Sequence, residues 1–227
     1  MWMEKRSSSC HQNKKISYNA YFSSHFSITL LFLETLVVLS QNHYLCITTQ
    51  MENIYQTTVS SPITFQGVGL HSGKSSEIKI LPAPANHGII FKRVDLKSDN
   101  YVKANYLNVS SAKLCTTLEN NNGVKVSTIE HLLAALYFAE IDNVLIEINN
   151  EEVPIMDGSA KIFLETLNKT EIKFFNEKRN FLKVINKVEL VDGERNISIE
   201  PSNDSLEIRF KLNYENNIIG NQQNTIN

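Results

Sequence analysis

The clearest helical pattern of apolar positions in the chain covers residues 127–136 (STIEHLLAAL). Apolar residues recur there at i, i+3, i+4 and i+7 and form a single stripe, which consists of Ile129, Leu132, Leu133 and Leu136. Ser127 stands just before the stripe and Glu130 follows three residues later, which is the spacing of a capping box. The pattern therefore predicts an amphipathic helix with Ser127 at its N-cap.

A histidine lies on the other side of this predicted helix. With a turn of about 100° per residue, His131 is nearly opposite the stripe, on a face that also carries Ala134 and Ala135. This face is small and uncharged, so we expect something to pack against it.

Two interpretations of the Glu130–His131 pair stay open. In the first, Glu130 only caps the helix and His131 is a core or interface histidine. In the second, His131 binds a metal and Glu130 handles a proton beside it. Position 135 is an alanine, so the segment is not H-E-x-x-H, and further ligands have to come from elsewhere.

The pattern around the helix is one of short strands and turns. Strands are predicted at residues 57–65, 76–81, 89–94, 101–108, 113–118, 124–126 and 143–148. A second helix, with its stripe at residues 162–167, follows a turn that contains Asp157 and Gly158. Asp157 has two interpretations, a catalytic residue or a helix-start residue, and we favour the second.

Polarity rises at residues 176–179, which indicates a domain boundary. Beyond it the pattern predicts a hairpin over residues 181–200 and a third strand over residues 206–212. Three strands have one apolar face and nothing to bury it against. We therefore expect a first domain at 51–178 and an incomplete second domain at 179–227.

The first fifty residues differ in character from the rest. They are rich in Ser, Asn and His, and their apolar run at 26–39 is short for a membrane span and contains Glu34. Lys14 and Lys15 precede the run, as in an export signal, but no small-x-small cleavage site follows it. Our interpretation is that Met51 is the natural start and that residues 1–50 are upstream sequence that packs on no domain. A membrane tether and an export signal are the alternatives.

Composition narrows the function classes. The chain has 227 residues, 42% of them hydrophobic, and a net charge of −2, so there is no electrostatic case for a nucleic-acid partner. Its three cysteines form no C-x-x-C pair, which argues against a disulfide framework and against a cysteine-rich zinc site. Cys115 is interpreted as a small buried thiol of a protein from a reducing compartment.

A glycine-rich turn at residues 66–75 is similar to a phosphate loop but has the wrong spacing. A Walker A motif places four residues between its first glycine and Gly-Lys-Ser. Relative to Gly73, Gly69 is one residue too close and Gly67 one too far. The turn is therefore predicted to connect two strands, with His71 exposed at its tip.

Six collinear motifs resemble one family, the UDP-3-O-acyl-N-acetylglucosamine deacetylases, which are zinc amidases of lipid A synthesis. The motifs lie at residues 67–74, 82–86, 114–116, 127–132, 141–143 and 154–160. The resemblance runs from about Met51 to the end of the chain. It implies two similar α+β domains with the active site between them, Zn²⁺ as cofactor, UDP-3-O-acyl-N-acetylglucosamine as substrate and a cytoplasmic location without a stable membrane span.

The resemblance also implies roles for individual residues. His131 matches a zinc ligand, and Glu130 matches the carboxylate that takes a proton from zinc-bound water. Leu114 and Cys115 match positions that line the substrate site. His71 matches a histidine in a loop near that site.

The chain departs from the family pattern in the second domain. The family's other zinc ligands come from a His-Lys-x-x-x-Asp-like segment there, and this chain has no histidine after His131. Two hypotheses follow: a zinc-dependent deacetylase by lineage, or a non-catalytic fragment that acts, if at all, only with a complementary C-terminal fragment. We expect purified residues 1–227 to bind no stoichiometric zinc and to show no deacetylation.

Overall fold

The computed structural model describes residues 16–23, 54–181, 183–202, 206–216, 218 and 220–226. Within these residues the fold is α+β, as predicted, with two α-helices and strands in several sheets. The chain divides into two compact units. Among the described residues, 54–180 form the first unit, and 16–23 together with residues from 181 onward form the second.

The first unit is built on a five-stranded sheet in the order β3 (Ile63–Val68), β4 (Ser75–Pro82), β10 (Val144–Ile148), β5 (Ile89–Arg93) and β6 (Tyr101–Lys103). Only the β10–β5 pair is parallel; the other neighbours run antiparallel. The strands predicted at 76–81 and 143–148 are confirmed as β4 and β10. Ile78, Ile80, Ile146 and Ile148 on these strands are all buried.

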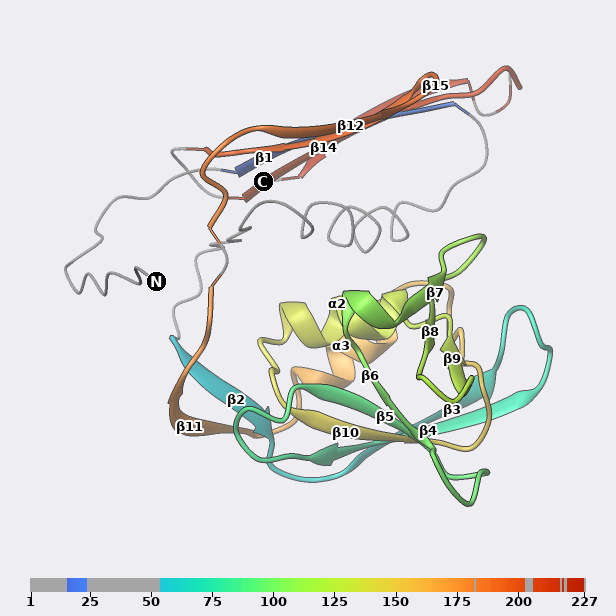
Figure 1. Cartoon of the computed structure of the whole chain (residues 1–227), viewed down its shortest axis with the longest axis vertical. Coiled ribbons are helices and arrows are strands. Elements are labelled where there is room, and N and C mark those ends of the chain that lie inside the picture. The colour runs from blue at the N-terminus through green and yellow to red at the C-terminus, as the bar shows by residue number, and fades with distance from the viewer. Residues whose placement is uncertain are drawn as a thin grey trace. The chain divides into compact units, whose positions relative to one another are not determined.

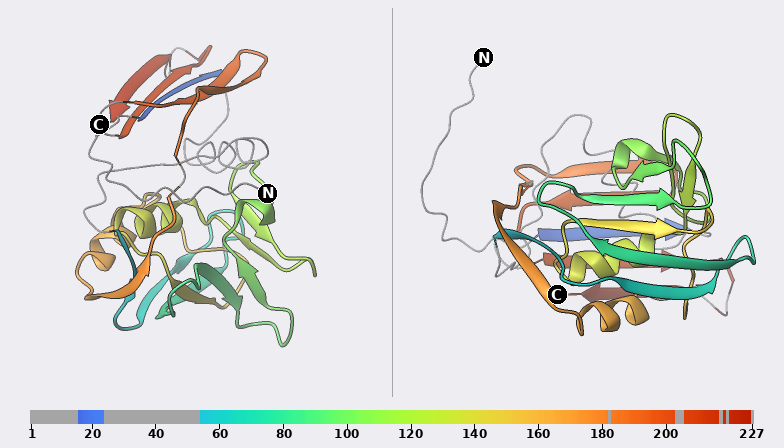
Figure 2. Two further views of the ribbon diagram at one scale, coloured as in Figure 1. Left: turned by 60° about the vertical axis from the view of Figure 1, so that its left-hand side comes forward. Right: turned by 90° about the horizontal axis from the view of Figure 1, so that it is seen from below.

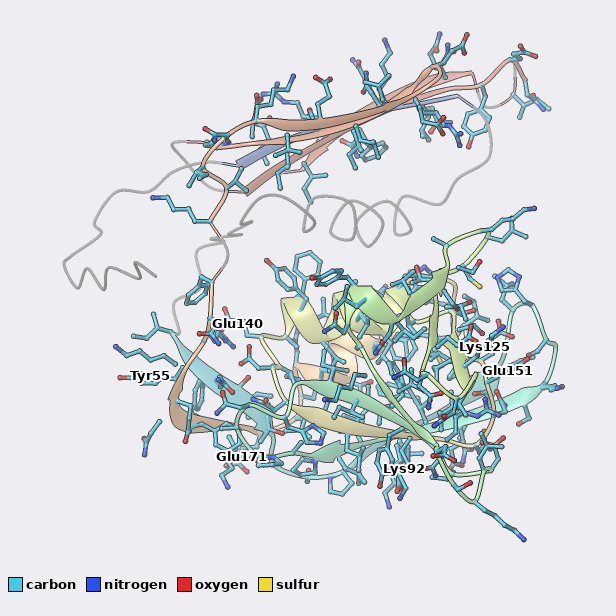
Figure 3. All side chains as sticks on the ribbon, viewed as in Figure 1. Tyr55, Lys92, Lys125, Glu140, Glu151 and Glu171 are labelled. Carbon is cyan, nitrogen blue, oxygen red and sulfur yellow. The ribbon has the colours of Figure 1, made fainter. Side chains whose placement is uncertain are left out.

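Helices α2 (Glu130–Phe138) and α3 (Lys161–Leu167) lie on the same face of this sheet (Figures 1 and 2). The core forms between sheet and helices, with Phe91, Leu132, Leu136 and Phe163 fully buried. The opposite face is polar: Lys92 of β5, labelled in Figure 3, pairs with Glu147 of β10 at 2.9 Å. This division gives α2 a buried apolar side and fixes it on the sheet.

A small sheet leads the chain into α2. It consists of β7 (Val109–Ser111), β8 (Thr117–Glu119) and β9 (Lys125–Ser127), and the 3₁₀ helix η1 (Tyr106–Asn108) precedes it. The strand predicted at 124–126 is confirmed as β9, which pairs antiparallel with β8. The predicted strand at 113–118 is wrong over most of its length, because Leu114 has a φ of 73° and turns the backbone away from extended geometry.

A two-stranded antiparallel sheet closes the first unit. β2 (Tyr55–Val59) pairs with β11 (Ile172–Lys178), a strand that the sequence pattern did not predict. Just after β11, Arg179 Nε donates to both carboxylate oxygens of Asp142 at 2.9 Å. Asp142 also accepts the backbone N–H of Thr57 in β2 at 2.7 Å, so the two ends of the unit are held together.

The second unit contains a five-stranded sheet in the order β12 (Val188–Asp192), β13 (Arg195–Glu200), β1 (Ile16–Ser23), β14 (Leu206–Asn213) and β15 (Asn221–Ile226). The hairpin predicted around Asp192–Gly193 and the strand predicted at 206–212 are confirmed. β15, which pairs antiparallel with β14, was not predicted from its Asn- and Gln-rich sequence.

Strand β1 differs from the expectation that residues 1–50 pack on no domain. It pairs antiparallel with β13 and parallel with β14. Its sequence ISYNAYFS alternates apolar and polar residues and is rich in aromatic side chains, which favours a strand. The remaining residues of 1–50, including the apolar run at 26–39, lie outside the described residues. The start at Met51 remains a hypothesis.

None of the helices in the described part of the chain is long and apolar enough to cross a membrane.

Candidate active site

Helix α2 starts two residues later than predicted, at Glu130, and the predicted capping box is wrong. Ile129 occupies the N-cap and provides no side-chain cap hydrogen bond. Ser127 belongs to β9 instead, and its N–H and Oγ both donate to the carbonyl oxygen of Glu151, at 2.7 and 3.1 Å. Figure 3 shows Glu151 near Lys125, the first residue of β9. Ser127 thus bonds to residues 151–153, and its hydroxyl is not available to cap the helix.

Thr128 makes the turn between β9 and α2 in a left-handed conformation. Its φ is 57°, and it is only 3% exposed. A β-branched residue rarely adopts this conformation, which costs of order 1–3 kcal/mol and persists only where surrounding contacts enforce it. One such contact is the hydrogen bond from Thr128 Oγ1 to Glu152 Oε1 at 3.0 Å.

Glu130 is the first residue of α2 and is buried, with 6% of its surface exposed. Its Oε2 accepts the backbone N–H of Thr116 at 3.2 Å. Glu130 therefore does not cap the helix as the first interpretation proposed. Its carboxylate faces Thr116 instead.

Two buried polar atoms near Glu130 have no hydrogen-bond partner. They are Oγ1 of Thr116 and Nδ1 of His131. Most buried polar groups in proteins are satisfied, so unsatisfied ones point to a function or a bound group. An imidazole nitrogen without a partner fits one zinc ligand. Among the residues that the structure describes, however, no three His, Cys, Asp or Glu side chains cluster as a complete metal site would require.

The glycine-rich turn connects β3 to β4, as predicted, and His71 is exposed. Its backbone donors are already occupied: the N–H groups of His71 and Ser72 donate to Glu152 Oε1 and Oε2 at 2.9 and 2.8 Å. An internal carboxylate thus takes the donors that a phosphate would use in a phosphate loop. This geometry agrees with the spacing argument against a Walker A motif.

Glu152 is a residue that sequence reasoning missed. It is 1% exposed and accepts hydrogen bonds from the loop and from Thr128. Burial raises the pKa of its carboxyl, but the hydrogen bonds from His71, Ser72 and Thr128 outweigh burial and bring the pKa below its usual range. The available signal was a glutamate directly before the apolar run Val153-Pro154-Ile155, where an unpaired charge is costly.

Residues 56–227 match the sequence model of the LpxC family, described as UDP-3-O-acyl N-acetylglycosamine deacetylase. The chain belongs to this family. It is 40% identical over 172 residues to the UDP-3-O-acyl-N-acetylglucosamine deacetylase of Geotalea uraniireducens (strain Rf4), covering 76% of this chain and 55% of the relative.

Two further relatives carry the same name. The protein of Phenylobacterium zucineum (strain HLK1) is 36% identical over 170 residues, covering 74% of this chain and 58% of the relative. That of Haemophilus ducreyi (strain 35000HP / ATCC 700724) is 37% identical over 166 residues, covering 73% and 54%. The chain spans about half the length of the curated relatives it matches.

Two of the residues that the family resemblance assigned to the substrate site, Leu114 and Cys115, directly precede Thr116 in the chain. Leu114 is 69% exposed, and Cys115 is a half-buried free thiol whose Sγ lies 3.8 Å from Thr117 Oγ1. The next residue, Thr116, contacts Glu130. The N–H of His71 donates to Glu152, and Glu152 also accepts the hydroxyl of Thr128, two residues before Glu130. The substrate-binding roles of Leu114, Cys115 and His71 remain predictions.

Asp157, the alternative catalytic candidate, forms a local turn. Its Oδ1 accepts the N–H and the Oγ–H of Ser159 at 3.0 and 2.9 Å, and Ser159 Oγ accepts the N–H of Lys161, the first residue of α3. These contacts fit the helix-start interpretation.

Proposed function

We propose that this chain carries part of the active site of a zinc-dependent deacetylase acting on UDP-3-O-acyl-N-acetylglucosamine, with Glu130 as general base and His131 as one zinc ligand. The carrying observation is that Glu130 is buried at the first turn of α2 and takes part in no capping box. Its carboxylate accepts the N–H of Thr116, whose buried hydroxyl has no partner. The names of the family and of its curated relatives supply the substrate class.

The chemistry assigned to this chain's residues is proton handling. Zinc, when bound, polarises the amide carbonyl and lowers the pKa of a bound water to near 7. Glu130 accepts a proton from the water that attacks the acetamide carbonyl. The C–N bond then breaks, and the products are acetate and a sugar amine that takes up a proton. The N–H of Thr116 holds the carboxylate in one orientation during this transfer. The site is thus arranged for general base catalysis of amide hydrolysis.

A second candidate is a fragment that is inactive alone and active with a complementary C-terminal segment. It is favoured by the donor set: the described residues offer His131 but no cluster of three ligands, whereas a catalytic zinc site uses about three.

One experiment tests both candidates. Residues 1–227 are purified alone and together with a segment that supplies a His-Lys-x-x-x-Asp sequence, and zinc content and deacetylation are measured. We expect neither zinc nor turnover for the chain alone, and both for the combination. Zinc and turnover in the combination should disappear with His131→Ala, and turnover alone should fall with Glu130→Gln. The proposed function would be contradicted if the two segments bind each other and the complex still shows no deacetylation.

A further inference from the structure

We propose that Glu152 is a positioning residue that fixes the His71 loop and the start of the Glu130–His131 helix to one another, so that both form one wall of the active site. This inference rests on the proposed function for its meaning in catalysis. Its physical basis, the sharing of one carboxylate by two segments far apart in sequence, stands on geometry alone.

The carboxylate joins the two segments directly. Oε1 of Glu152 accepts both the N–H of His71 at 2.9 Å and the hydroxyl of Thr128 at 3.0 Å. Oε2 accepts the N–H of Ser72 at 2.8 Å. Because two donors share one oxygen, a movement of the loop displaces the acceptor of Thr128, and the reverse also holds.

The backbone of Glu152 is fixed independently of its side chain. Its carbonyl accepts the hydroxyl of Ser76 in β4 at 2.5 Å, and its N–H donates to Asn150 Oδ1 at 2.8 Å. Residue 152 also forms a parallel bridge with Ser127 of β9. The carboxylate is therefore presented from a rigid base on the main sheet, as a positioning group requires.

The loop is shaped to admit this carboxylate. Gly69 has no side chain, and a Cβ there would collide with Oε2 of Glu152 and Oγ of Ser72. Its φ is outside the left-handed region, so the glycine is required by the close approach and not by backbone strain. On the helix side, the strained Thr128 stands two residues before Glu130. Any relaxation of Thr128 would therefore move the proposed general base.

The first test replaces Glu152 by Gln in the full chain, with Glu151→Gln as matched control at the neighbouring exposed position. The amide of Gln accepts through one oxygen only, so one backbone donor of the loop loses its acceptor. We expect protection from amide hydrogen exchange to fall about ten- to a hundredfold in residues 69–74 and in residues 127–133 together. Protection of β4 and β10 should stay unchanged, whereas a merely structural role would lower it across the sheet.

The second test approaches from the loop side. Gly69→Ala should displace the carboxylate, and the backbone chemical shifts of Thr128 should lose their left-handed signature although the change lies in a distant loop. If Glu152→Gln does not fold, Thr128→Val tests the same coupling between loop and helix start, with Thr128→Ser as control. Protection of the His71 and Ser72 amides should fall in the valine variant and persist in the serine variant.

The inference is overturned if only one of the two segments loosens, if Glu151→Gln has the same effect as Glu152→Gln, or if Thr128 keeps its left-handed shifts in Gly69→Ala. None of these measurements uses deacetylation. Coupled loosening, together with no deacetylation when the complementary segment is added, would reject the proposed function and leave the coupling intact. Full deacetylation by that combination, with the two segments uncoupled, would do the reverse.

Discussion

The two helices of the first unit start in different ways. At α3, Asp157 and Ser159 make hydrogen bonds to residues two positions away, and both Asp157 and Gly158 are exposed. At α2, Thr128 is buried and strained, and its hydroxyl bonds to a glutamate 24 residues away. Neither N-cap residue provides a side-chain bond. The comparison teaches that α3 starts where local residues direct it, whereas α2 starts where long-range contacts hold it.

The largest expected difference between the two helix starts is in catalysis. Glu130→Gln keeps the shape of the side chain but cannot accept a proton, so turnover of a complemented, active protein should fall by about 10²–10⁴-fold. Asp157→Asn, the same carboxylate-to-amide change at α3, should lower turnover far less. Steady-state kinetics on both variants measures the loss of turnover. Equal losses in the two variants would show that the two helix starts do not differ in catalysis.

The second difference concerns stability. Thr128→Val keeps a β-branched side chain but removes the hydroxyl that bonds to buried Glu152. We therefore expect a loss of about 1–3 kcal/mol in the free energy of unfolding. Ser159→Ala removes exposed local bonds and should cost less than Thr128→Val. Urea denaturation of the two variants, with Thr128→Ser as control, gives the values. A larger loss at Ser159 would show that the local turn matters more than the long-range contact.

A third difference appears in the pH dependence of stability. The pKa of Glu152 lies below its ordinary value of 4.5, so its carboxylate stabilises the fold above that pH and this contribution is lost as pH falls through the lower, folded-state pKa. Glu152→Gln should therefore flatten the decline of stability below about pH 4.5.

The pKa of Asp157 is also lowered, first by the side-chain hydrogen bond from Ser159, but solvent screens this exposed group. Asp157→Asn should therefore change the loss of stability at low pH less than Glu152→Gln does. The free energy of unfolding at a series of pH values, with Glu151→Gln as a further control, decides the order.

The smallest effect is expected from a deletion that touches neither helix start. Strand β1 belongs to the second unit, so removal of residues 1–50 should leave hydrogen exchange around residues 127–133 and 157–163 unchanged. Amides of β13 and β14, which pair with β1, should lose protection. Unchanged protection in β13 and β14 would instead support the original interpretation, in which residues 1–50 pack on no domain.

The sequence by itself determined the elements whose signals are local. Residues close together in the chain carry the signals for the apolar stripe of α2, for strands β4 and β10 and for the Asp192–Gly193 hairpin. The spacing of the glycine-rich turn excluded a phosphate loop for the same reason. Hydrophobic periodicity reports such features because it follows the repeat of the backbone itself.

Only the tertiary structure decided where α2 starts and what holds it there. The hydrogen bonds from Ser127 to the carbonyl of Glu151 join residues 24 positions apart, and they replace the local capping box that the sequence pattern favoured. The partner of β1 is likewise a strand near the other end of the chain. Side-chain pairing across such separations depends on the completed packing of the sheet, and no local pattern of residues encodes it. Glu152 and the strained Thr128 therefore became visible only in the folded chain.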